Sequence, residues 1–400
     1  MADKPELLSP AGDWERLNMA LLYGADAVYL AGREFGMRAA AGNFDDERLA
    51  AAVRLAHGKD VKVYVTCNTL PREEELERLP RYLGFLQEAG VDALIIADMG
   101  VLHMAKQYAP KLARHVSTQF GVTNSASANA LYELGADTVV LAREVPLADI
   151  RRIRANTPPE LRLEAFVHGA MCVSFSGRCL LSNYLTGRDA NRGQCAQPCR
   201  WKYHLVEETR PGEYFEISED GGTYIMNSRD LCMIEHIPEL LDAGVSSLKI
   251  EGRMKSAYYT AVVTNAYRHA IDAVLSGKPV ERIWIAETEK LSHRPYSTGF
   301  YFDQPGQHCA EASYFSTADV AAVVESCDTE GNAVLTQRNK FYCGDTLELL
   351  LPDAPPMPFV AEHIYDTDGE ELEDTRRAMM ELRMKLPAAA PKGAIVRKNR

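Results

Sequence analysis

The sequence predicts an α/β protein built on a (β/α)8 TIM-like barrel, with a long cysteine-rich insertion before the last strand and a small β-rich C-terminal domain. Short apolar runs alternate with amphipathic stretches along the first 280 residues, a pattern typical of repeated βα units. Several amphipathic stretches end in a glycine turn, such as Gly24-Ala25-Asp26 and Gly135-Ala136-Asp137, that leads into an apolar run. Glycine just past a helix is the usual start of a helix-to-strand connection.

Eight apolar runs are the expected barrel strands. Their bounds are Glu6–Leu8, Ala27–Leu30, Val61–Thr66, Ala93–Ala97, His115–Thr118, Thr138–Ala142, Leu163–Val167 and Ser247–Ile250. Helices are expected between the first seven, for example over Trp14–Tyr23, Glu73–Ala89 and Ala126–Leu134. Eight units of one kind favour a closed barrel, and an open doubly wound sheet is the alternative. No GxGxxG or P-loop segment follows any strand, so there is no dinucleotide or phosphate-loop signature.

The chain is expected to divide into two domains. Residues 1–280 would form the barrel, closed by a helix over Ala257–Ser276 and interrupted by the insertion at about 169–235. Short segments separated by turns indicate a small antiparallel β domain over 285–400, with a charged helical stretch near Glu370–Leu386. The last basic residues are expected to form a solvated, disordered tail: Lys392, Arg397, Lys398 and Arg400.

Composition limits the possible functions. The 400 residues carry 44 basic and 56 acidic side chains, a net charge of −12, which excludes a uniformly basic nucleic-acid-binding protein but not a local basic patch. No uncharged apolar run is long enough for a membrane span, and the N-terminal segment has early charges and no signal-peptide core. The protein is therefore expected to be cytoplasmic, in a compartment that keeps thiols reduced.

Five of the nine cysteines lie in the insertion, within a single stretch of 61 residues. They read Cys172-x6-Cys179-x15-Cys195-x3-Cys199, with Cys232 another 33 residues on. In a reducing compartment, clustered cysteines indicate metal binding or catalysis before disulfides. Four converging thiolates can hold a metal ion or an iron–sulfur cluster. The spacing matches neither a zinc ribbon nor a ferredoxin, so unrelated buried cysteines are the alternative.

The same segment is locally basic. Residues 178–202 carry five basic side chains and one acidic side chain, with aromatic residues such as Tyr184 and Trp201 among them. Positive charge beside stacking aromatics suits a flipped or single-stranded nucleotide. Arg178 and Arg188 are therefore candidate substrate-binding residues, and an ordinary charged loop is the alternative.

A second group of candidates lies at the carboxyl ends of the expected strands, where barrel enzymes place reactive groups. Three cations, Arg143, Lys249 and Arg253, would suit a polycarboxylate or a phosphate, which guanidinium groups bind in a fork. Glu144 and Glu251 could orient these cations or transfer protons. The remaining candidates are Asn68, Gln119 and His168. The histidine is expected to face the same cavity as the cysteines, with a core histidine as the alternative.

Several segments resemble the collagenase-like U-32 peptidase family. Residues 164–201 contain EAFVHGAMC, SFSGRC and RGQCAQPCRW, and NSRDLC and SLKIEGRMKS follow at 227–232 and 247–256. ELLSPAG and GADAVYL near the start also match, so the likeness spans nearly the whole chain. These segments are similar to those of the prephenate-dependent tRNA uridine hydroxylases, which form 5-hydroxyuridine at the wobble position. Relatives hydroxylate a cytidine in 23S ribosomal RNA or act in oxygen-independent ubiquinone synthesis.

The resemblance implies an RNA-modifying hydroxylase with a 4Fe–4S iron–sulfur cluster and prephenate as co-substrate. Five cysteines compete for the four ligand positions, and we expect the ligands to be the four in the densest motif: Cys172, Cys179, Cys195 and Cys199. Cys232, expected to start a helix, is an alternative ligand. We infer from the residues that the cationic strand ends bind the prephenate dicarboxylate and that the basic insertion receives an anticodon nucleotide. The β-rich domain with its basic end would hold the rest of the tRNA, and a paralogous subunit is a further candidate partner.

Two other functions stay open. A true peptidase, as the family name says, would need a free thiol or a metal-bound water, but the sequence has no HExxH, no GxSxG and no recognisable triad. Five clustered cysteines also suit a cysteine protease poorly, because metal ligation consumes the nucleophile. A non-catalytic or quinone-pathway partner would carry the cluster without binding RNA.

Overall fold

The first domain is a closed barrel of eight parallel strands. The computed structural model describes residues 4–37, 42–201, 205–206, 214–215, 228–306 and 316–400. In order around the ring the strands are β1 (Glu6–Pro10), β2 (Ala27–Leu30), β3 (Lys62–Cys67), β4 (Ala93–Ile96), β5 (Ala113–Val116), β6 (Thr138–Val140), β7 (Arg162–Ala170) and β11 (Ser247–Ile250). β11 pairs in parallel with both β7 and β1, so the ring is closed. The predicted barrel is confirmed, and the open-sheet alternative is wrong.

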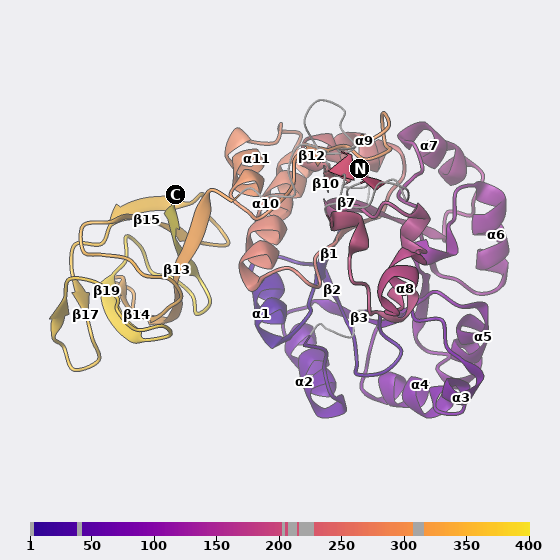
Figure 1. Ribbon diagram of the computed structural model, residues 1–400, viewed down its shortest axis with the longest axis horizontal. Coiled ribbons are helices and arrows are strands. Elements are labelled where there is room, and N and C mark those ends of the chain that lie inside the picture. Colours follow the sequence, from indigo (N-terminus) through magenta and orange to yellow (C-terminus); the bar gives the residue numbers. More distant parts are fainter. Residues whose placement is uncertain (1–3, 38–41, 202–204, 207–213, 216–227, 307–315) are drawn as a thin grey trace.

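Helices surround these strands (Figure 1). They are α1 (Trp14–Leu22), α2 (Asp46–His57), α3 (Glu73–Leu76), α4 (Leu79–Glu88), α5 (Met99–Tyr108), α6 (Ser125–Glu133), α7 (Leu147–Ala155), α9 (Ile237–Asp242) and α10 (Ala257–Leu275). The single helix expected over Glu73–Ala89 is two helices, because Pro80 lies in the first turn of α4. Proline lacks the N–H that would continue the hydrogen-bond ladder of α3, so a new helix begins there.

The insertion lies between β7 and β11. Its short helix α8 (Leu181–Thr186) lies across the barrel strands (Figure 1). Single turns of 3-10 helix lie at Phe175–Gly177, Ala190–Arg192 and Pro198–Arg200, and the short strands are β8 (Leu205–Val206), β9 (Tyr214–Phe215) and β10 (Asp230–Cys232). The expectation that Cys232 starts a helix is wrong. Its strand β10 pairs antiparallel with the end of β7 and parallel with β12 (Tyr296–Ser297), which extends the barrel sheet.

The second domain is an antiparallel sheet beside α10 and α11 (Figure 1). Its strands are β13 (Ala318–Cys327), β14 (Asn332–Gln337), β15 (Thr346–Leu350), β16 (Met357–Val360), β17 (Ile364–Tyr365), β18 (Glu371–Leu372), β19 (Glu381–Lys385) and β20 (Ile395–Asn399). The sheet begins at Ala318 rather than near residue 285, because α11 (Arg282–Glu289) packs on α10. The helix expected near Glu370–Leu386 is wrong, since β18 and β19 occupy that stretch.

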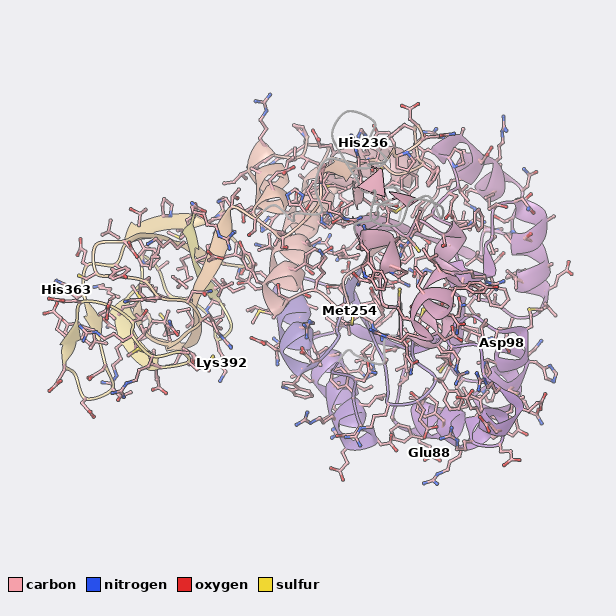
Figure 2. All side chains as sticks on the ribbon, in the orientation of Figure 1. Glu88, Asp98, His236, Met254, His363 and Lys392 are labelled. Carbon is pink, nitrogen blue, oxygen red and sulfur yellow. The ribbon has the colours of Figure 1, made fainter. Side chains whose placement is uncertain are left out.

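The expected disordered tail is also wrong. It forms β20, which pairs with β13 and β15, and each of its four basic residues takes part in an ion pair: Lys392 with Glu325, Arg397 with Glu287 and Glu348, Lys398 with Asp345, and Arg400 with Asp319. Figure 2 shows Lys392 on the second domain, well away from Met254 in the barrel. The tail charges therefore serve the fold of their own domain and its contact with the barrel.

Arg397 connects the two domains. Its side chain is fully buried and donates to both carboxylate oxygens of Glu287 on α11, each at 2.6 Å. It also donates to Glu348 on β15 and to the hydroxyl of Tyr258 on α10. The hydroxyl of Tyr23 donates to the Leu350 carbonyl at 3.0 Å. These contacts hold the β domain against the barrel helices. Within the described residues, no helix is both long and apolar enough to cross a membrane.

Candidate functional site

A cavity of about 250 Å³ lies between the carboxyl ends of the barrel strands and the insertion. Most residues predicted from the sequence line it: Asn68, Gln119, Arg143, Cys172, Cys179, Arg188, Cys195, Cys199, Lys249, Glu251 and Arg253. Met254, labelled within the ring of helices in Figure 2, belongs to the same wall. The barrel and the insertion thus form one site that brings thiols, cations and amides together.

Three of the thiols share one local geometry. The main-chain N–H of the residue two positions on points at each sulfur: Ser174 at Cys172, Leu181 at Cys179, and Gln197 at Cys195, each with a nitrogen-to-sulfur distance of 3.4 Å. Such bonds favour the charged thiolate over the thiol. Hydrogen bonds to sulfur are also a recurring feature of iron–sulfur sites, where they tune the cluster.

The fourth thiol, Cys199, interacts electrostatically with the other three. Burial raises its pKa, nearby Arg200 lowers it, and the charges of Cys172, Cys195 and Cys179 raise it further. Four sulfur donors in one cavity make a soft ligand set, of the kind that holds iron–sulfur clusters. Among the described residues, no three His, Cys, Asp or Glu side chains are placed to hold a single metal ion.

Four predicted residues do not line the cavity: Cys232, His168, Glu144 and Arg178. Cys232 is half-buried on β10, with its sulfur 3.9 Å from the Tyr267 hydroxyl, and desolvation raises its pKa to about 11. His168 is buried on β7 among the rings of Tyr259, Tyr267 and Tyr296. Desolvation lowers the pKa of His168 to about 3, so the ring is neutral. The expectation that it faces the cysteines is wrong, because the alternation of β7 turns it toward α10.

Glu144 acts as a clamp on the insertion rather than as a cavity wall. Its two carboxylate oxygens accept hydrogen bonds from the main-chain N–H of Ser176 at 2.7 Å and from the Ser176 hydroxyl at 2.9 Å. Ser176 has a φ of 47°, a left-handed conformation that a residue other than glycine adopts at a cost. Glu144 therefore stabilises the turn between Cys172 and Cys179.

Glu144→Ala should loosen this turn. Each hydrogen bond to the charged carboxylate contributes about 1.5–3 kcal/mol, so the segment should open at least about ten times more often. We expect Cys172 and Cys179 of the metal-free protein to react faster with an alkylating reagent, as measured by mass spectrometry. Glu160→Ala, at an exposed glutamate before β7, is the control. Equal alkylation rates in both variants would contradict the clamp.

Three cations form the polar part of the cavity wall. Arg143 stacks over Phe166 at 4.0 Å, lies 3.6 Å from Glu251 and donates to the Ala170 carbonyl. Lys249 is 2.6 Å from Glu164. Arg253 donates to the Thr66 hydroxyl and to the Met37 carbonyl. These contacts fix the three cations in place, which suits recognition of an anion.

An amide pair completes the wall. Asn68 donates to the Gln119 side-chain oxygen at 3.1 Å, and the Ser117 hydroxyl donates to the same oxygen at 3.2 Å. The Asn68 oxygen accepts from the main chain of Met37. The two bonds to Gln119 orient its amide at the cavity wall, where it can recognise a polar ligand group.

The insertion over the cavity carries exposed basic and aromatic side chains. Arg188 is exposed and its Nε donates to the Gln194 carbonyl, whereas Arg178 is exposed but does not line the cavity. Tyr184 on α8 is 81% exposed, and Trp201 is also exposed. Of these four side chains Arg188 lines the cavity, and the other three are exposed on the same insertion.

Several residues that line the cavity from the barrel strands are not among the predicted site residues, for example Tyr29, Thr66 and Phe166. Thr66 could have been found as a polar residue at a strand end. Tyr29 and Phe166 look like ordinary core residues, because nothing in their local sequence shows that the cavity reaches them.

Comparison with known proteins identifies the family. The pattern of peptidase family U32 matches residues 12–311, and that of the U32 C-terminal domain matches residues 316–397. The chain belongs to peptidase family U32. The predicted resemblance is therefore confirmed, and the second match covers the antiparallel domain.

Several U32 relatives have names that refer to RNA. The chain is 37% identical to "tRNA hydroxylation protein P1" of Bacillus subtilis (strain 168), over 99% of this chain and 95% of the relative. It is 36% identical to "tRNA hydroxylation protein P" of Escherichia coli (strain K12), over 92% of this chain and 91% of the relative. It is 38% identical to "23S rRNA 5-hydroxycytidine C2501 synthase" of the same strain, over 86% of this chain but 52% of the relative.

Proposed function

We propose that this chain is a cytoplasmic tRNA-modifying hydroxylase that forms 5-hydroxyuridine at the wobble position, with a 4Fe–4S cluster and prephenate as co-substrate. The observation that carries the proposal is the single cavity in which four thiols and three ordered cations meet. The names of the full-length U32 relatives support the substrate class. Each part of the site then has a role.

The four cavity cysteines would hold the cluster. All four donors are sulfur, and three of them already accept main-chain hydrogen bonds that favour thiolates. When bound, the cluster supplies one-electron chemistry at the barrel mouth. Cys232 is not included, because its sulfur faces Tyr267 rather than the cavity.

The cations would bind prephenate. It carries two carboxylates, and guanidinium groups bind carboxylates through paired hydrogen bonds. Arg143 and Arg253 are held by Phe166 and Thr66, so they are ordered before the ligand arrives. Lys249 would supply a third positive charge from the barrel floor. Glu251, beside Arg143, would orient that arginine or take part in proton transfer.

The rim would receive the anticodon nucleotide. Tyr184 offers an exposed ring on which a base can stack, and Arg178 and Arg188 offer positive charge to the phosphates. The net charge of −12 and the ion-paired tail favour a local contact over binding along the whole chain. The second domain therefore has less charge to offer RNA than the sequence suggested.

Two observations favour this function over the alternatives. The chain spans 95% of the tRNA-named relative and only 52% of the ribosomal-RNA synthase, which favours tRNA. His168 lies behind the cavity among tyrosines, so it does not form the thiol–histidine pair that a cysteine peptidase needs.

A deletion strain tests the proposal. We expect nucleosides from its tRNA to lack wobble 5-hydroxyuridine, measured by mass spectrometry, and the modification to return with the plasmid-borne gene. Quinone levels and the 23S ribosomal RNA should be unchanged. Normal 5-hydroxyuridine in the deletion strain, with lost quinones or lost ribosomal hydroxycytidine, would instead support one of the other family functions.

A further inference from the structure

A column of polar side chains runs through the barrel interior below the cavity. Lys249 Nζ lies 2.6 Å from Glu164 Oε1. The Ser247 hydroxyl lies 3.2 Å from the other oxygen of Glu164 and 3.1 Å from Glu6 Oε1. None of the four side chains is more than 7% exposed. They form a continuous hydrogen-bonded path in the part of a barrel that apolar side chains usually fill.

Strand register explains why these residues meet. Ser247 on β11 lies beside Glu164 on β7 and beside Glu6 on β1, so the three side chains share one layer of the barrel. Lys249 lies two residues further along β11, on the same face of the strand and one layer nearer the cavity. The path therefore follows directly from the closure of the barrel at β11.

The column opens at both ends. Lys249 lines the cavity that holds the cysteines. Glu6 lines a second cavity, of about 540 Å³, which also contains Lys62 and Arg162 at the amino ends of the strands. The path thus connects two cavities on opposite ends of the barrel.

The hydroxyl at the centre has one hydrogen for two carboxyl groups. When Ser247 donates its hydrogen to Glu6, it can form a hydrogen bond with Glu164 only if the Glu164 carboxyl is protonated and donates to it. When Ser247 donates to Glu164 instead, the Glu6 carboxyl must be the protonated one. The arrangement therefore has a place for one additional proton. A serine hydroxyl suits this position, because it can accept a proton on one side while it releases one on the other.

Other charged or titratable groups surround the lower end. The Tyr64 hydroxyl donates to Glu6 at 2.7 Å, and Arg162 lies 3.3 Å and Lys62 4.0 Å from the same carboxylate. Desolvation and the neighbouring Glu6 raise the pKa of Tyr64, so it stays a neutral donor. Burial lowers the pKa of His115, which packs on Tyr64, to about 3. Neither Tyr64 nor His115 carries a charge at neutral pH.

We propose that Glu6, Ser247, Glu164 and Lys249 form a proton relay between the lower cavity and the catalytic cavity. The role of this relay in turnover rests on the proposed function, whereas the hydrogen-bonded path does not depend on it. The anionic ligand near Lys249 is the proton acceptor. The relay supplies protons to the closed end of the site, away from the RNA at the rim.

The transfers balance with one proton. At the start Glu6 carries the additional proton, and Glu164 is a carboxylate paired with Lys249. Lys249 gives a proton to an oxygen of the ligand and becomes a neutral amine. Ser247 then passes its hydrogen to Glu164 while it accepts the proton of Glu6, and Glu164 gives its new proton to Lys249. Solvent in the lower cavity reprotonates Glu6. Each step breaks one O–H or N–H bond as the next one forms, and no electron moves.

Ser247→Ala cuts the path but keeps the Lys249–Glu164 ion pair. Ser9→Ala is the matched control, because Ser9 is an equally buried serine on β1 whose hydroxyl contacts Thr264 instead. In the hydroxylation assay we expect kcat of Ser247→Ala to fall at least about tenfold, with KM for prephenate unchanged. The wild type should show a curved dependence of rate on the D2O fraction, and the variant a linear one. An unchanged kcat and unchanged isotope dependence would overturn the relay.

A second measurement needs no turnover. Carbon-13 carboxyl NMR of glutamate-labelled protein, assigned with Glu6→Gln and Glu164→Gln, reports on the two carboxyl groups directly. We expect their signals to change together as the pH is varied in the wild type and in Ser9→Ala, and separately in Ser247→Ala. Independent changes in the wild type would overturn the relay. Coupled signals without any hydroxylation would instead count against the proposed function alone.

Discussion

Cys195→Ser is expected to yield folded protein that lacks the cluster. Serine keeps the size of cysteine but replaces a soft thiolate with a hydroxyl that stays protonated at neutral pH, so one of four ligands is lost. Purified without oxygen, the wild type should contain about four irons per chain and show broad visible absorbance. The variant should lose most of the iron and the absorbance, and its 5-hydroxyuridine formation should fall below detection.

Two other cysteines provide the controls. Cys232 is half-buried outside the cavity, and Cys343 is exposed in the second domain. We expect Cys232→Ala and Cys343→Ala to keep the iron and the absorbance of the wild type. Loss of iron in Cys232→Ala together with its retention in Cys195→Ser would contradict the ligand assignment, and would make Cys232 a ligand.

Arg397→Ala is expected to cause the largest loss of stability. Removing one partner of a buried ion pair leaves the other charge uncompensated, which costs about 3–5 kcal/mol, and here Glu287 would lose its bidentate partner. Urea unfolding followed by circular dichroism should show a lower midpoint, or separate unfolding of the β domain. Arg400→Ala removes an exposed arginine that follows the same strand and should change little. Equal effects of the two substitutions would contradict the role of Arg397.

The stability contributed by the ion pair between Arg397 and Glu348 should depend on pH. Burial acts to raise the pKa of Glu348, but hydrogen bonds from Lys290 and Asn399 and the charge of Arg397 lower it to about 2. A carboxylate whose pKa is lowered by folding stabilises the folded state above its unfolded pKa, about 4.3. This contribution should be lost as the pH falls from about 4.3 to about 2. The pH dependence of unfolding in wild type and Glu348→Gln measures it, and parallel curves would contradict it.

The barrel could be predicted because its strands are buried on both faces. Runs such as Ala27–Leu30 and Ala93–Ile96 are therefore apolar throughout, and turns that can be recognised in the sequence bound them. The second domain was harder, because its strands bury one face only. The ELRMK stretch of β19 alternates exposed and buried residues, but its charges suggested a helix. The order of the tail could not be predicted, because the sequence does not show that Glu287 and Glu348 lie opposite Arg397.

The sequence allows most residues of the site to be predicted, but not the role of each residue. The thiols lie in the insertion and the three cations lie at the carboxyl ends of barrel strands, which the fold brings together. Their residue types therefore indicate metal binding and anion binding. Glu144 and His168 are equally polar, yet one clamps a turn and the other lies in the core. Glu6 and Glu164 received no role, because their significance depends on the register of β1, β7 and β11.

The central claim is tested most directly by reaction of purified, iron-loaded protein with tRNA that lacks the modification. Nucleoside mass spectrometry after incubation with and without prephenate measures 5-hydroxyuridine. We predict that it forms at the wobble position only when protein and prephenate are both present. Cleavage of gelatin by the same protein, with no 5-hydroxyuridine in any sample, would contradict the account.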